Sequence, residues 1–237
     1  MTALTAQEFV DACSVDPEVF SLRPDYRAVV LAAEGLQTSG LETEIQGLLA
    51  RAETSAREAA ATAPVADLPH IAAWRDAFRA FGAKPSDYRN SAEALLRRAS
   101  DGLPRINPLT DVYNALSVIY QAPIGGEDLD GYEGPARLVR ARGDEPFDTL
   151  ASGDTALEYP KPGEVVWRDD RGVTCRRWNW RQCQRTQLTA RTTRAFFIID
   201  ALGPLSDLRV SELEAELTQW LERCGATLVA SRVIAQG

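Results

Sequence analysis

Histidine, lysine and closely spaced cysteines are scarce in this 237-residue sequence. The only histidine is His70, so a Ser-His-Asp triad would have to use it, and a metal site would need mostly carboxylates or thiols. The four cysteines form no C-x-x-C pair, which argues against a structural zinc site. We therefore expect no metal and no other cofactor, and we expect the cysteines to be reduced core thiols.

Long apolar runs are also missing. No stretch approaches the ~18 apolar residues of a transmembrane helix. Residues 1–9 contain neither the basic start nor the apolar centre of a secretory signal. Hydrophobic residues nevertheless make up 45% of the chain, which is enough to bury a core. We expect a cytoplasmic protein with no membrane partner.

The charge is unevenly distributed along the chain. The net charge of −8 argues against a protein that coats nucleic acid non-specifically. However, residues 168–194 contain eight arginines and only two acids, a charge of +6 that leaves −14 for the remainder. Arginine binds phosphate and carboxylate bidentately, so this block is a candidate anion site. The alternative is a set of ion pairs with the acidic remainder.

The patterns of apolar residues, caps and turns predict a mixture of helices and strands. The predicted helices cover residues 1–12, 41–62, 70–81, 90–99, 109–120 and 211–223. The predicted strands cover residues 26–33, 136–140, 164–168, 173–180, 195–201 and 227–234, with a hairpin turn at 169–172. We expect a single α+β domain over residues 1–237, with N-terminal helices packed on a mixed or antiparallel sheet.

The predicted helix 109–120 is unusual because Asp111 is its only formal charge. Asn107 and Pro108 form a good start for it. A polar stripe that includes Thr110, Asp111 and Asn114 runs beside its apolar stripe. A surface helix normally carries more charge, so we expect this polar stripe to face a buried network or a cleft.

A second unusual segment lies between Cys175 and Gln182. If it is extended, Trp178 and Trp180 share one face, and Arg177, Asn179 and Arg181 share the other. The second face would suit recognition of a carboxylate, a phosphate or an ester oxygen. Alternatively, the tryptophans pack in the core and the arginines cap nearby carbonyls.

Four further residues carry expectations of their own. Asp200 follows four apolar residues, so it is either a binding group or the partner of an arginine. Gly125 and Gly126 permit close approach of a ligand, although a loop is the simpler interpretation. His70 follows a proline, and we expect it to cap a helix or lie on the surface.

Residues 107–134 resemble the B3/B4 domain of the β-subunit of bacterial phenylalanyl-tRNA synthetase. The resemblance rests on the Asp-Val-Tyr-Asn helix start at 111–114, the proline-containing loop that follows, and Asp-Leu-Asp at 128–130. Residues 162–166 and 175–182 resemble free-standing members of the same family. The similarity covers roughly residues 65–235.

The resemblance implies a tRNA-binding editing module, because this domain in the synthetase hydrolyses the ester of tyrosine wrongly attached to tRNA. The synthetase loop has a His-Ala-Phe-Asp run where this chain has Gly-Gly-Glu-Asp at 125–128, so the pocket histidine is absent. The glycine-rich strand of the synthetase pocket is replaced by residues 177–181. The acid that reads the tyrosine hydroxyl would fall near Asp200.

These observations lead to a hypothesis of a free-standing domain that binds the aminoacylated 3′ end of tRNA and hydrolyses a mis-attached ester in trans. Catalysis is assigned to Asp111, Glu164 and Asn114. Substrate binding is assigned to Asn107, Thr110, Arg177, Trp178, Asn179, Arg181 and Asp200. Two alternatives remain open: a non-catalytic module that binds RNA or an aminoacyl group, and a binder or enzyme of a free amino acid-like small molecule.

Overall fold

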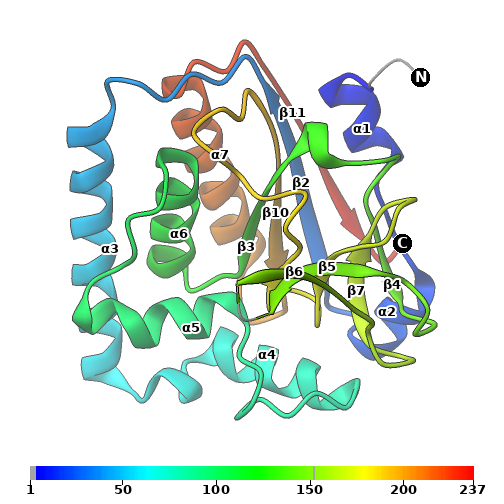
Figure 1. Ribbon diagram of the computed structural model, residues 1–237. Coiled ribbons are helices and arrows are strands. Elements are labelled where there is room, and N and C mark those ends of the chain that lie inside the picture. The colour runs from blue at the N-terminus through cyan, green and yellow to red at the C-terminus, as the bar shows by residue number, and fades with distance from the viewer. Residues whose placement is uncertain (1–3, 152) are drawn as a thin grey trace.

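The computed structural model describes residues 4–151 and 153–237 (Figure 1). Its α-helices are α1 (Ala6–Ala12), α2 (Pro17–Leu22), α3 (Glu42–Thr62), α4 (Pro69–Ala80), α5 (Ser91–Arg98), α6 (Pro108–Tyr120) and α7 (Asp207–Arg223). Short 3-10 helices cover Val65–Asp67, Ala99–Asp101 and Leu129–Gly131. Within the described residues, no helix combines the length and apolarity needed to cross a membrane.

An antiparallel four-stranded sheet forms the centre of the fold, in the order β11-β2-β10-β3. Its strands are β2 (Arg27–Glu34), β3 (Ile124–Asp128), β10 (Arg194–Ala201) and β11 (Leu228–Ala235). The uniformly apolar runs in β2 and β10 pair along their full lengths at the middle of this sheet. Such runs are expected where both faces of a strand are buried.

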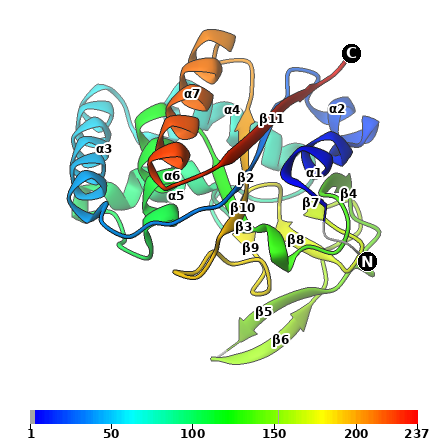
Figure 2. The same ribbon diagram turned by 90° about the horizontal axis from the view of Figure 1, so that it is seen from above.

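The two faces of the central sheet bury different layers. Leu31 pairs with Phe197, and both point into the core shared with α3, α6 and α7. The neighbouring pair Val30 and Ile198 points into the opposite core, shared with α1, α4 and a second sheet. Figures 1 and 2 show the sheet lying between these two layers. This arrangement confirms the predicted α+β fold with helices packed on a mixed or antiparallel sheet.

The second sheet has five short strands in the order β1-β4-β7-β8-β9. They are β1 (Ser14–Val15), β4 (Arg137–Arg140), β7 (Val165–Arg168), β8 (Val173–Arg176) and β9 (Arg181–Gln182). β1 and β4 are parallel, and the other neighbours are antiparallel. The predicted turn at 169–172 joins β7 to β8, where the Asp169 carboxylate accepts hydrogen bonds from the backbone of Arg171 and Gly172.

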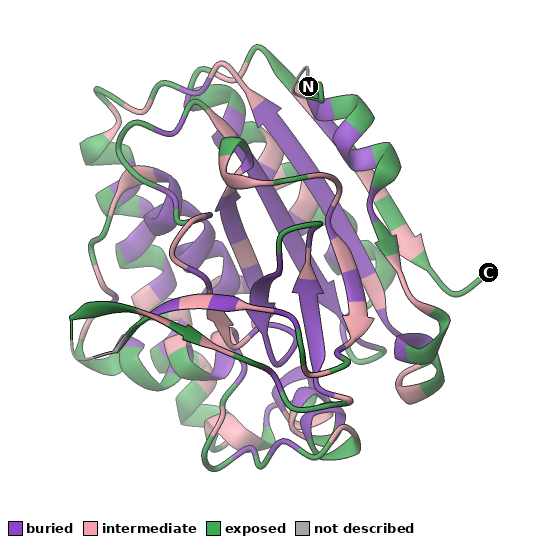
Figure 3. Ribbon diagram, turned by 45° about the vertical axis from the view of Figure 1, so that its right-hand side comes forward, coloured by how far each residue is buried: buried purple, intermediate pink, exposed green. Residues whose placement is uncertain are grey.

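A two-stranded hairpin of β5 (Phe147–Ala151) and β6 (Asp154–Glu158) projects from the body of the molecule (Figure 2). Much of it is exposed in Figure 3, and Leu157 has 61% of its surface accessible. The hairpin has no counterpart among the strands predicted from the sequence. Its strands alternate weakly and contain several charged or polar residues, so they lack the apolar pattern that identified the buried strands.

Three predicted elements differ from the structure. The strand predicted over 173–180 ends at Arg176, because Arg177 and Trp178 have positive φ angles of 46° and 67° and turn the chain. The glycine pair at 125–126 lies within β3 rather than in a loop. The last helix begins at Asp207 and is capped by Ser206, whose Oγ accepts from the Arg209 backbone, instead of beginning at Ser211.

Candidate functional site

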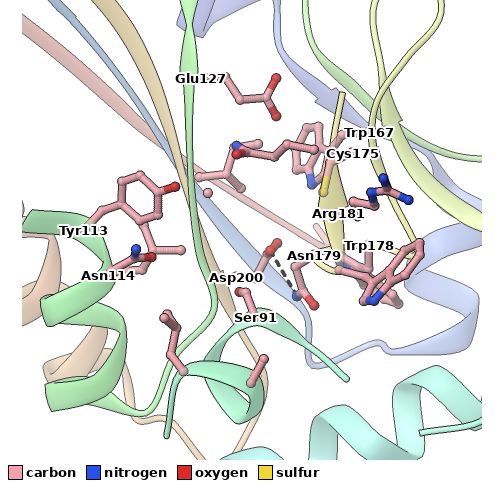
Figure 4. Close-up of a pocket in the computed structure, with 17 residues that line it drawn as sticks. Ser91, Tyr113, Asn114, Glu127, Trp167, Cys175, Trp178, Asn179, Arg181 and Asp200 are labelled. Carbon is pink, nitrogen blue, oxygen red and sulfur yellow. Dashed lines mark hydrogen bonds between the residues drawn. The ribbon is translucent and has the colours of Figure 1, made fainter. Parts of the chain in front are cut away.

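A cleft of about 240 Å³ opens where the edge strands β3 and β9 of the two sheets approach each other (Figure 4). Helices α5 and α6 also border it. The lining residues are Ser91, Ala94, Leu95, Tyr113, Asn114, Ile124, Gly125, Glu127, Trp167, Cys175, Trp178, Asn179, Trp180, Arg181, Gln182, Ile198 and Asp200. A concave, largely apolar space with a few polar groups is typical of a ligand site.

One side-chain hydrogen bond connects the two edge strands at the cleft. Nε2 of Gln182 in β9 donates to the carbonyl oxygen of Gly126 in β3 at 2.7 Å. Gly126 has to be a glycine because a Cβ atom there would lie 2.7 Å from the Tyr113 ring and 2.9 Å from Phe197. The close packing of Tyr113 on Gly126 therefore sets how near α6 lies to β3.

Asp200 is a buried carboxyl group in the cleft, with 2% of its surface exposed. Its Oδ1 accepts a hydrogen bond of 2.5 Å from the Tyr26 hydroxyl, and its Oδ2 accepts one of 3.1 Å from Nδ2 of Asn179. No described arginine or lysine nitrogen lies within 4.0 Å of it, so the alternative of pairing with an arginine is not what the structure shows. Burial raises the pKa of Asp200 to about 7.

Glu127 is a second buried carboxyl group in the cleft, and the sequence analysis did not identify it. It pairs with Phe196 of β10. Phe196 lies on the same face of the sheet as Ile198 and Asp200, which follow it by two and four residues along β10. Tyr132 donates a hydrogen bond of 2.7 Å to its Oε2. Burial raises the pKa of Glu127 to about 6. The cleft thus holds two carboxyl groups that can gain or lose a proton near neutrality.

Several polar atoms around the cleft are buried without a hydrogen-bond partner among the described residues. They are Oγ of Ser91, Nε1 of Trp167, Nε1 of Trp178 and Oδ1 of Asn179. Buried polar atoms in native proteins are nearly always satisfied by protein, water or ligand. A hydroxyl, two indole N–H groups and an amide oxygen around the cleft therefore lack a partner among the described residues.

The turn between β8 and β9 places three of the predicted site residues. Its left-handed residues, Arg177 and Trp178, each cost roughly 1–3 kcal/mol of backbone strain, because neither is glycine. The turn sends the Trp178 indole into the core, where its ring centroid lies 4.9 Å from that of Tyr26 and 5.2 Å from that of Trp74. The next residue, Asn179, then reaches Asp200.

The predicted grouping of Arg177, Asn179 and Arg181 on one face does not occur. Arg177 points away from the cleft, and its guanidinium carbon lies 3.7 Å from the centre of the Tyr88 ring and 4.3 Å from that of Trp180. Arg181 does line the cleft, with 38% of its side chain exposed, and its Nη2 donates to the Leu150 carbonyl at 3.4 Å. The left-handed turn separates the two arginines.

The cleft brings together half of the residues predicted from the sequence. Those that line it are Asn114, Trp178, Asn179, Arg181 and Asp200. The polar stripe of the 109–120 helix thus faces the cleft at Asn114. Residues missed by the sequence analysis include Tyr113, Glu127 and Gln182. The Gly-Gly-Glu-Asp run that contains Glu127 drew attention for its two glycines and its missing histidine, not for its glutamate.

The other predicted residues lie outside the cleft lining. Oδ1 of Asn107 accepts from the Thr110 backbone N–H at 3.0 Å and thereby caps α6. Oδ1 of Asp111 accepts from the backbone of Ile106 at 2.8 Å, and burial raises the pKa of its carboxyl. Glu164 is held by the Arg176 guanidinium through two hydrogen bonds of 2.9 Å. Their catalytic and binding roles stay predictions.

Most arginines of the 168–194 block are engaged with acids of the same chain. Arg176 pairs with Glu164, as described, and Arg185 donates two hydrogen bonds of 2.7 and 2.8 Å to Asp169. Arg168, Arg171 and Arg194 also lie within 4.0 Å of carboxylates. The alternative of internal ion pairs therefore accounts for most of the block.

His70 is buried and both of its ring nitrogens have backbone partners, so the expected helix-cap or surface position is wrong. Its ring is 4% exposed, with Nδ1 2.9 Å from the carbonyl oxygen of Gln121, while Nε2 accepts a 3.0 Å hydrogen bond from the Leu202 backbone. Burial lowers its pKa to about 4. His70 is not part of the cleft lining. Within the described ranges, no three His, Cys, Asp or Glu side chains gather as metal ligands would.

Comparisons with known proteins agree with this architecture. A model of the B3/4 domain family matches residues 73–223. An N-terminal fragment of the phenylalanyl-tRNA synthetase β-subunit from Pyrococcus horikoshii has a similar structure, with a TM-score of 0.52 and 10% sequence identity. The match covers 100% of this chain but only 57% of that one. No curated protein matches the sequence. The chain belongs to the B3/4 domain family.

Proposed function

We propose that this protein binds the aminoacylated 3′ end of a tRNA and hydrolyses a mis-attached aminoacyl ester in trans, in the cytoplasm. The observation that carries this proposal is the pair of buried carboxyl groups, Glu127 and Asp200, in one aromatic-lined cleft. The family and the similarity to a synthetase β-subunit support a tRNA partner.

The cleft offers an aminoacyl group apolar walls for its side chain and polar acceptors for its α-amino group. Trp167, Trp178 and Tyr113 supply apolar walls for a side chain. The α-amino group of an aminoacyl ester is a hydrogen-bond donor that carries positive charge when protonated. Asp200 and the unpartnered Oδ1 of Asn179 are acceptors at a suitable place for it. Arg181, at the exposed rim, is positioned for the RNA end.

Ester hydrolysis needs a base for the attacking water and donors for the oxyanion that develops on the carbonyl. A carboxylate with a pKa near 6 or 7 is a better base at neutral pH than an ordinary glutamate or aspartate. We assign water activation to Glu127 or Asp200 and water positioning to Asn114. The free indole N–H of Trp167 is an oxyanion donor in this scheme.

The direct test is release of amino acids from a panel of aminoacyl-tRNAs by the purified protein. Glu127→Gln and Asp200→Asn should each remain folded, and the one that acts as base should lose about 10²-fold or more of the rate. Glu158→Gln, on the exposed hairpin, is the matched control and should keep the rate. Release no faster than in buffer for every aminoacyl-tRNA would reject hydrolysis.

A second candidate function is binding without turnover. It is favoured because His70, the only histidine, lies outside the cleft and serves the core. An RNA 3′ end that carries its amino acid through a non-hydrolysable amide would then bind tightly, while the ester analogue stays intact. Binding of free amino acids with no affinity for either RNA would instead identify a small-molecule protein.

A further inference from the structure

A second, smaller cavity of about 190 Å³ lies beside the same left-handed turn that shapes the cleft. Arg177 lines this cavity, whereas the next four residues, 178–181, line the cleft. Tyr88, Lys161 and Glu164 also line it. One four-residue turn therefore presents side chains to two neighbouring cavities.

The cavity contains positive charge that the surrounding acids do not fully compensate. Nη1 of Arg177 is buried without a partner among the described residues, and only 7% of the residue is exposed. Nη2 of Arg177 lies 3.8 Å from Glu164, but Arg176 already holds that carboxylate through two shorter bonds. No described carboxylate lies within 4.0 Å of the Lys161 ammonium.

The charged residues around the cavity also include more cations than anions. Arg176, Arg177, Arg181 and Lys161 are four cations around Glu158 and Glu164, which are two anions. The group therefore has an excess of two positive charges. Burial also lowers the pKa of Arg177, as expected for a cation that has lost water without gaining a full counter-charge.

The guanidinium of Arg177 is held in a fixed orientation. It lies over the Tyr88 ring at 3.7 Å and over the Trp180 ring at 4.3 Å from their centres. Two aromatic contacts and the left-handed backbone keep the donor in place before any ligand arrives. Backbone strain at non-glycine residues occurs most often at functional sites.

We propose that this cavity binds a phosphate group of an RNA strand, held by Arg177, Lys161 and the Tyr88 hydroxyl. A phosphate accepts several charge-assisted hydrogen bonds at once, and its charge would offset the local excess of positive charge. The RNA source rests on the proposed function, whereas phosphate binding itself does not.

The chain has only two lysines, Lys161 and Lys84, and this permits a simple test. Both are exposed, but only Lys161 lines the cavity. The folded protein is acetylated with an amine-reactive ester in the presence or absence of inorganic phosphate, and each lysine is followed by peptide mass spectrometry. Saturating phosphate should slow acetylation of Lys161 by about 10-fold and leave Lys84 unchanged. Equal reaction of both lysines at all phosphate concentrations would overturn the proposal.

A second arm identifies the source of the phosphate. A short single-stranded RNA should protect Lys161 at a lower concentration than inorganic phosphate does. If phosphate protects and RNA does not, the RNA assignment is wrong. Lys161→Ala should weaken RNA binding about 5-fold to 10-fold, and Lys84→Ala should leave it unchanged. These measurements use no aminoacyl ester, so a failure of the hydrolase proposal would not affect their outcome.

Discussion

Nδ2 of Asn179 donates a hydrogen bond of 3.1 Å to Oδ2 of Asp200, a carboxyl group that is buried between the two sheets. The Tyr26 hydroxyl donates to the other oxygen. Two neutral donors stabilise the carboxylate less than burial destabilises it, so its pKa rises to about 7. The two hydrogen bonds therefore fix the orientation of the group while leaving it able to take up a proton.

Asp200 should make the stability of the protein depend on pH. Between pH 3.8, the ordinary pKa, and about 7, the folded chain keeps a proton that the unfolded chain has lost. The free energy of unfolding should therefore fall as the pH rises through this range, by at most about 4 kcal/mol. Asp200→Asn removes this contribution. Urea unfolding of both proteins at pH 5 and pH 8 measures it.

The control for this prediction is Asp148→Asn. Asp148 lies in the hairpin near Arg185, outside the cleft lining. It should leave the difference between pH 5 and pH 8 as in the parent protein. If Asp200→Asn also keeps the parent pH profile, the carboxyl of Asp200 is not protonated in the folded chain at pH 5.

The adjacent glycines of β3 should respond very differently to the same substitution. In Gly126→Ala the new methyl group would lie under 3 Å from the Tyr113 and Phe197 rings, so overpacking should cost about 1–3 kcal/mol of stability. In Gly125→Ala the nearest atom is Nε2 of Gln182 at 3.8 Å, and stability should change little. Thermal unfolding of both variants tests this. Equal melting temperatures would contradict the packing described for Tyr113.

Much of the fold follows from local patterns in the sequence. The helix starts at Asn90 and Asn107 were recognised because each asparagine caps a backbone N–H three residues later. The start of the last helix was misplaced because the sequence offers two serines that could cap it, Ser206 and Ser211. The structure uses Ser206, whose helix includes the buried Val210 in the apolar stripe. A cap motif alone does not distinguish between such neighbours.

The cleft was harder to predict because its residues come from separate parts of the chain. The four apolar residues before Asp200 were enough to mark it as a candidate site residue. Glu127 was missed because two preceding glycines favour a loop, whereas tertiary packing against Tyr113 makes them part of a strand. The separation of Arg177 from Arg181 depends on positive φ angles at non-glycine residues, which no sequence pattern indicated.

Glu164 should be important mainly for stability. Its carboxylate is 5% exposed and forms two hydrogen bonds to the guanidinium of Arg176. Glu164→Gln leaves a buried arginine partly unpaired, which should cost about 3–5 kcal/mol. Glu158→Gln is a matched control, because Glu158 contacts the same guanidinium at 2.7 Å but is 40% exposed.

The expected cost of Glu158→Gln is about 1 kcal/mol or less. Urea unfolding gives both values. Any hydrolytic activity of Glu164→Gln, measured at a temperature where it is folded, separates the structural role from the predicted catalytic one. A folded Glu164→Gln protein with normal stability and no activity would favour catalysis.

His70 should oppose Asp200 in the pH dependence of stability. Its imidazole is buried between the Gln121 carbonyl and the Leu202 amide, and its pKa falls from 6.5 to about 4. Between these values the unfolded chain binds a proton that the folded chain does not. The free energy of unfolding should therefore decrease as the pH falls from 6.5 to 4, by at most about 3 kcal/mol.

His70→Gln retains an amide donor and acceptor but cannot titrate. Relative to the parent protein, it should gain stability as the pH falls from 7.5 to 4.5, whatever small constant cost the altered shape imposes. Asp200→Asn should change in the opposite direction over the same interval, so the two variants control each other. Urea unfolding at both pH values gives the comparison, and parallel profiles for His70→Gln and the parent would show that the histidine is protonated in the folded chain.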